Sequence, residues 1–177
     1  MNVLHDIGVI VQVMLLIPVL YGLCNLSYQH PYSVGSRKIA IGIMALFCTA
    51  LFLLFGVLKI MADVLYMFPQ GIFGVWLLIF CLHSGNMLSR FHKWFGVVVG
   101  FGLALVGAFP LEYAVFVDPI ILSIPAAKPA EVEKIPISEA NMIVHQILFI
   151  GSPMGVLTLP FWTLWLGRQL LRVPARG

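Results

Sequence analysis

Polar side chains lie at the ends of the long apolar segments of this sequence, and they are its candidates for chemistry. They form four neighbouring pairs: His5 and Asp6, Lys59 and Asp63, Glu112 and Tyr113, and His145 and Gln146. Imidazole, carboxylate and amide groups can bind the polar part of a small molecule. Ionisable groups at membrane depth often mark sites or pathways. If their helices bundle together, these pairs form one pocket near the same membrane surface.

Each pair also has a purely structural explanation. His5 and Asp6 can be solvated, because they lie at the start of the sequence. Lys59 precedes Asp63 by four residues, so the two can pair along one helix face, or Lys59 can extend to the lipid headgroups. His145 can form a hydrogen bond to another helix or to a loop instead of binding a ligand.

His83 lies deeper in its apolar segment, close to Ser84, Gly85 and Asn86. A polar cluster at that depth must face protein or water, so it either joins helices or binds a ligand such as a quinone headgroup. A b-type haem needs two histidines at similar depth. His83 and His145 differ in depth by ~10 Å, from the rise per residue of a helix, so this pair is a poor haem site. Haem b or a quinone stays the alternative cofactor.

Catalytic motifs are absent from the sequence. There is no H-E-x-x-H, P-loop, dinucleotide fingerprint or serine hydrolase motif, and no cluster of three or four potential metal ligands. The three cysteines all lie in apolar segments, without a C-x-x-C pair. We therefore predict no catalytic residue and no metal site, and we favour a protein that is not an enzyme. An intramembrane enzyme acting on lipid is an alternative.

The elements that must position these residues are helices in a membrane. Of the 177 residues, 61% are hydrophobic and 10% are charged, and a soluble domain of this size cannot bury so much apolar surface. The net charge of +3 arises at helix ends rather than in a basic run, so nucleic acid is not an expected partner. The sequence predicts an all-α, polytopic helix bundle in a lipid bilayer, forming one domain.

Five membrane-spanning helices are expected, at about residues 3–26, 39–62, 71–88, 94–109 and 140–167. The first is expected to be a retained span rather than a signal peptide, and Ser138 to cap the last. Residues 67–70 should form a tight turn. Residues 110–137 should form an extracytoplasmic loop, because five prolines and several charges leave too few residues for a crossing. The last span is long enough to require a bend, which Pro153 and Pro160 favour.

Basic residues concentrate on one side of this arrangement. With the N-terminus outside, the cytoplasmic side receives no acid and seven basic residues: Arg37, Lys38, Arg90, Lys93, Arg168, Arg172 and Arg176. The other side receives all seven acids and three lysines. This asymmetry follows the positive-inside rule. We expect an outside N-terminus and a cytoplasmic C-terminus, in a bacterial inner (plasma) membrane.

Small residues recur every four positions in the fourth span: Gly96, Gly100, Ala104 and Ala108. Such a stripe lets helix backbones approach closely in lipid. It either packs against a neighbouring span or forms an interface in a homo-oligomer or a larger membrane complex.

The sequence thus favours a small membrane protein that binds a hydrophobic or amphipathic molecule in an outer-leaflet pocket, or that serves as an accessory subunit. The alternative is a redox protein in which His83 or His145 serves haem or quinone. The residues expected to bind the ligand are His145, Gln146, Lys59, Asp63, Asp6, His5, His83 and Asn86.

Overall fold

The structure is a computed structural model that describes residues 11, 14, 36–58, 60–83, 88–124 and 138–170. All regular structure in these residues is helical, which confirms the all-α prediction. Four segments of the described chain are long and apolar enough to cross a membrane: Ala40–Val57, Val64–His83, Arg90–Phe116 and Glu139–Leu166. The first expected span, residues 3–26, lies outside the described residues except for Val11 and Met14, which are helical and exposed.

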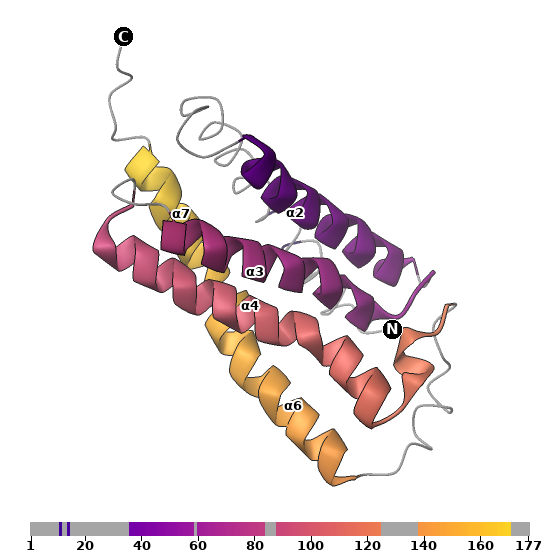
Figure 1. Cartoon of the computed structure of the whole chain (residues 1–177). Helices are drawn as coiled ribbons and strands as arrows, with labels where there is room; N and C mark the ends of the chain where they lie inside the picture. The colour runs from indigo at the N-terminus through magenta and orange to yellow at the C-terminus, as the bar shows by residue number, and fades with distance from the viewer. Residues whose placement is uncertain are drawn as a thin grey trace.

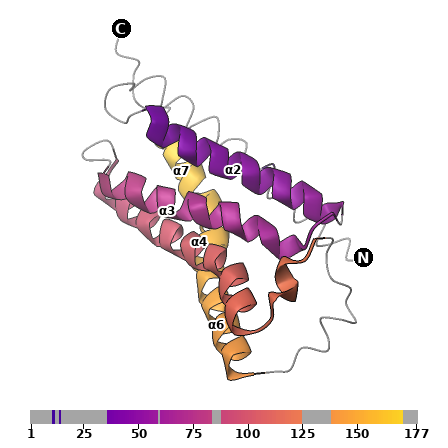
Figure 2. The same ribbon diagram turned by 45° about the vertical axis from the view of Figure 1, so that its right-hand side comes forward.

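The helices pack side by side in chain order, with one long helix in the middle (Figure 1). They are α2 (Ser36–Val57), α3 (Met67–His83), α4 (Arg90–Phe116), and a last segment made of α6 (Glu139–Ser152), η3 (Pro153–Leu157) and α7 (Leu159–Leu170). α3 and α6 both pack on α4, and α2 packs on α3. Figure 2 shows α7 passing behind α3 and α4. α4 is therefore the central helix, which contacts α3, α6 and α7, while α2 is held through α3.

Glycines allow the backbones to meet on both sides of α4. A Cβ added to Gly107 would lie 2.2 Å from the Cα of Gly71 in α3. On the other side, a Cβ added to Gly102 would lie 2.3 Å from the backbone nitrogen of Gly155 in η3. Close backbone approach of this kind is how helices pack in lipid, where dispersion contacts replace the hydrophobic effect.

The loop expected at residues 110–137 begins later than predicted. α4 continues through a buried Pro110 to Phe116, and Pro119–Leu122 forms a 3-10 helix, η2, capped by Asp118. The prediction was wrong for this stretch because a proline inside a membrane helix is tolerated where neighbouring groups satisfy the freed backbone carbonyl. Residues 125–137 lie outside the described chain.

The tight turn expected at residues 67–70 is also wrong, because these residues form the first turn of α3. Pro69 lies within that turn, where the missing N–H of proline would have had no partner in the helix. A 3-10 helix, η1 (Asp63–Tyr66), precedes it. α3 therefore starts earlier than the predicted residue 71; it is described as far as His83, and Leu88, where the span was expected to end, is not helical.

The last membrane segment is interrupted at Pro153. The regular helix α6 ends at Ser152, and residues 153–157 form a turn of π-helix before α7 begins. Proline cannot donate the backbone hydrogen bond that the α-helix needs at this point, and π-turns accommodate such breaks.

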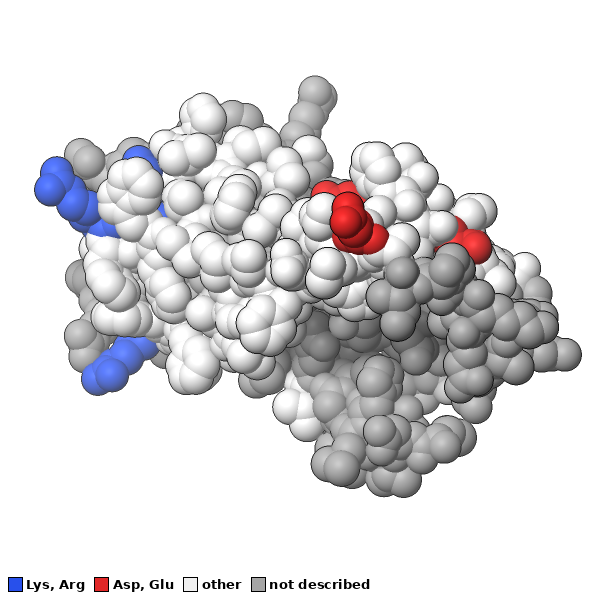
Figure 3. Space-filling view, turned by 90° about the horizontal axis from the view of Figure 1, so that it is seen from below, with Lys and Arg blue, Asp and Glu red and all other residues white. Residues whose placement is uncertain are grey.

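Charged side chains separate to the two ends of the bundle (Figure 3). Among the described side chains, Arg90 and Lys93 at the start of α4 and Arg168 near the end of α7 mark one end, called here the basic end. The opposite end, called the acidic end, carries Glu112, Asp118 and Glu139.

Candidate functional site: two grooves beside α4

The first candidate site is an apolar groove between α4 and the bent segment α6–η3, called groove A. Its volume is about 750 Å³, which is in the range of small-molecule sites. Most of its lining residues belong to α6 and η3, and Tyr66 of η1, Met67 at the start of α3 and Val106 of α4 complete it. The lining residues are Tyr66, Met67, Val106, Met142, His145, Gln146, Leu148, Phe149, Ser152, Pro153, Val156 and Leu157.

The break at Pro153 shapes groove A. Pro153, Val156 and Leu157 of the π-turn line it together with Ser152 from the end of α6. A π-turn changes the direction of side chains relative to a continuous α-helix, and such turns are frequent at functional sites. The Oγ of Ser152 donates to the backbone oxygen of Leu148 at 2.8 Å, so this hydroxyl is already used within the helix.

His145 is the imidazole of groove A. Its Nδ1 lies 2.8 Å from the backbone oxygen of Asn141. A carbonyl oxygen can only accept, so Nδ1 carries the hydrogen, and in the neutral ring Nε2 presents a lone pair. The ring packs edge-on against Phe109 and Tyr113, at centroid distances of 5.6 and 6.0 Å. The two rings and the hydrogen bond hold the imidazole in one orientation.

Gln146 lies next to His145 on the exposed side of α6. Its amide offers both donors and an acceptor. Groove A therefore combines a polar site at one position with walls that are otherwise mostly hydrocarbon.

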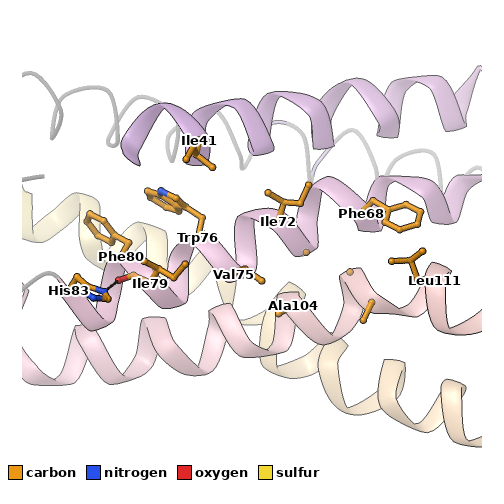
Figure 4. Close-up of a pocket in the computed structure, with 13 residues that line it drawn as sticks. Ile41, Phe68, Ile72, Val75, Trp76, Ile79, Phe80, His83, Ala104 and Leu111 are labelled. Carbon is orange, nitrogen blue, oxygen red and sulfur yellow. Dashed lines mark hydrogen bonds between the residues drawn. The ribbon is translucent and has the colours of Figure 1, made fainter. Parts of the chain in front are cut away.

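The second candidate site, groove B, lies between α2, α3 and α4 and has a volume of about 550 Å³. Figure 4 shows Phe68 and Leu111 at one end and His83 at the other. The Nδ1 of His83 lies 2.9 Å from the backbone oxygen of Ile79. The lining residues are Ile41, Phe68, Gly71, Ile72, Val75, Trp76, Ile79, Phe80, His83, Ala104, Gly107, Ala108 and Leu111.

The structure brings only part of the predicted site together. His145 and Gln146 share groove A, whereas His83 lines groove B. The two histidines face different grooves, so they do not form the ligand pair of one haem. The backbone of Asp63 starts η1, and its side chain is not among those described; the other candidates, His5, Asp6, Lys59 and Asn86, lie outside the described residues.

Three of the four small residues of the fourth span, Gly96, Gly100 and Ala104, lie against α3 of the same chain. A Cβ added to Gly100 would lie 2.8 Å from the backbone oxygen of Gly74, and one added to Gly74 would lie 2.6 Å from the backbone nitrogen of Ala104. Gly96 faces the Sγ of Cys81 in α3. Ala108 lines groove B.

Sequence reasoning missed a buried histidine at the basic end. His92 is only 3% exposed, and its Nδ1 lies 2.7 Å from the Oγ of Ser89, which caps α4. The indole of Trp162 donates to the backbone oxygen of His92 at 3.2 Å. The Nε2 of His92 is buried beside the backbone of Trp165, and it makes no hydrogen bond of good geometry there. The spacing of Ser89 and His92 matches an N-cap, but the contact with α7 has no sequence signal.

Comparisons of the chain with known protein families, curated proteins and solved structures gave no match. Within the described part of the chain, no three His, Cys, Asp or Glu residues are placed to hold a metal ion. The function is therefore inferred from the geometry of grooves A and B.

Proposed function

We propose that this membrane protein binds an amphipathic small molecule in groove A. The polar head of the ligand would contact His145 and Gln146, and its apolar part would lie along α6 and η3. The observation that carries the proposal is the position of these two polar side chains in a groove of about 750 Å³ whose remaining walls are mostly apolar.

The tautomer of His145 defines the head group. Because its Nδ1 donates to Asn141, the neutral ring meets the ligand with the lone pair of Nε2. That lone pair needs a donor, and a hydroxyl group supplies one. The amide of Gln146 can bind a second hydroxyl or a carbonyl. The ligand class is therefore a hydroxyl-bearing lipid, such as a monoacylglycerol or the quinol form of a quinone.

The five-span arrangement, with the N-terminus outside and the C-terminus cytoplasmic, belongs to this proposal. The separation of Arg90, Lys93 and Arg168 from Glu112, Asp118 and Glu139 supports it, because basic residues favour the cytoplasmic side. His145 lies about two turns from the acidic end of its helix, so the polar part of groove A would lie in the outer leaflet. A bacterial inner membrane is the proposed location.

The test compares two probes with the same chain. Delipidated protein in detergent is titrated with 1-oleoylglycerol, which has hydroxyl donors, and with methyl oleate, which has none, and binding is measured by native mass spectrometry. The wild type should bind 1-oleoylglycerol about fivefold more tightly, the value of one net hydrogen bond. His145→Phe keeps an aromatic ring against Phe109 and Tyr113 but removes Nε2, so it should abolish the preference.

His83→Phe is the matched control, because His83 makes the same local hydrogen bond in the other groove. It should leave the preference unchanged. If His145→Phe binds both probes as the wild type does, or if only His83→Phe loses the preference, the ligand does not bind in groove A.

A further inference from the structure

Groove B continues toward the basic end along one face of α4. Arg90, Ala104 and Leu111 are separated by multiples of seven residues, which is close to a whole number of turns of an α-helix. Lys93 and Gly107 are likewise separated by a multiple of seven residues. Because Ala104, Gly107 and Leu111 line groove B, the two basic residues lie on the face of α4 that forms the groove, beyond its basic end.

The groove itself is suited to a hydrocarbon chain. Its wall on α3 runs from Phe68 to His83, about 22 Å at the rise of an α-helix, within a hydrocarbon core of about 30 Å. Ile72, Val75 and Ile79 on its rim are exposed on the outside of the bundle, so the groove opens sideways to lipid.

Small residues make the floor of groove B. Gly71, Ala104, Gly107 and Ala108 all line it, and none has a side chain long enough to fill the space. An unfilled groove loses dispersion contacts, which a flexible acyl chain can supply.

We propose that groove B binds one acyl chain of an anionic phospholipid, with the lipid phosphate at Arg90 and Lys93. Among the described side chains, the basic end carries Arg90, Lys93 and Arg168 and no carboxylate, so a negative headgroup is attracted and meets no repulsion there. Basic sites between membrane helices bind anionic headgroups in this way. The site is separate from groove A, and it would stand if nothing bound at His145.

The experiment uses delipidated full-length protein and two lipids with identical palmitoyl and oleoyl chains, phosphatidylglycerol and phosphatidylcholine. Affinities are measured by native mass spectrometry. The wild type should prefer phosphatidylglycerol. Arg90→Gln should weaken phosphatidylglycerol binding about fivefold, the value of one basic residue near a membrane surface. It should leave the affinity for phosphatidylcholine nearly unchanged. Arg168→Gln removes the same charge at the same end, from a helix that does not line groove B, and should change neither affinity.

A second pair of variants tests the acyl chain. Ala108→Leu narrows groove B and should weaken the binding of both lipids, whereas Ala50→Leu, at a half-buried position of α2 that lines neither groove, should weaken the binding of neither. If Ala108→Leu does not fold, Ile79→Asn on the exposed rim should likewise weaken both lipids. The proposal is overturned by equal binding of the two lipids to the wild type. It is also overturned if Arg90→Gln and Arg168→Gln change phosphatidylglycerol binding equally. Folded Ala108→Leu or Ile79→Asn protein that binds both lipids as tightly as the wild type would overturn it as well.

Discussion

Grooves A and B flank the same helix and repeat one local arrangement, yet they are suited to different ligands. In each, a histidine donates from Nδ1 to the backbone oxygen four residues earlier, Asn141 for His145 and Ile79 for His83. What differs is the surroundings. His145 has an amide neighbour, Gln146, and lies in the half of α6 nearer the acidic end, whereas His83 ends α3 at the basic end, where Arg90 and Lys93 begin α4. In the two proposals, the groups around each histidine, rather than the histidine itself, therefore distinguish the head groups.

The largest effect should come from breaking the contact that forms the floor of groove B. Gly107→Leu places a side chain where even a Cβ would lie 2.2 Å from the Cα of Gly71. Overpacking of this kind costs about 3 kcal/mol or more of unfolding free energy, measured by denaturant titration in detergent micelles. Phosphatidylglycerol binding should fall more than 1-oleoylglycerol binding, because groove A lies on the other side of α4. Equal loss of both ligands, or unchanged stability, would contradict the separation of the two grooves.

A smaller effect should follow from Trp162→Phe, which removes the hydrogen bond from the indole to the backbone oxygen of His92. The expected loss is about 2 kcal/mol of unfolding free energy, because the smaller ring removes this bond and also leaves a cavity at a fully buried position. Trp162 lines neither groove, so both binding preferences should survive. Trp94→Phe, at an exposed position of α4 that lines neither groove, provides the control. A selective loss of either ligand would show that α7 shapes that groove.

The smallest effect should be the response to salt. Raising the ionic strength from about 0.1 M to about 1 M shortens the screening length from about 10 Å to about 3 Å. Phosphatidylglycerol binding should weaken, because Arg90 and Lys93 are near the surface, and 1-oleoylglycerol binding should not. Titrations at the two salt concentrations measure both. The electrostatic distinction between the grooves fails if the two ligands respond alike.

Local features of this fold were predictable from the sequence, and those that depend on helix neighbours were not. Ser138 was expected to cap the last segment, and its Oγ does accept from the backbone nitrogen of Asn141 at 3.2 Å. Pro110 was wrongly taken as the end of a helix, because a proline ends helices in water more reliably than in lipid.

The candidate site was likewise only partly predictable from the sequence. His145 and Gln146 were recognisable as polar residues near the end of a span, but the groove they line depends on how η3 packs against α4. His92 was missed because its burial depends on Trp162 and Trp165, about seventy residues later in the chain. Spacing along one helix predicts a face, and only the packing of helices shows what that face meets.

The most direct test is the ¹⁵N NMR spectrum of protein labelled at histidine, with the His145 signals assigned from His145→Phe. Groove A predicts that Nδ1 of His145 is protonated and that Nε2 is not. It also predicts that adding 1-oleoylglycerol shifts the Nε2 signal toward a hydrogen-bonded position while the signals of His83 stay in place. A deprotonated Nδ1, or an Nε2 signal that does not move when the ligand is bound, would contradict the proposed site.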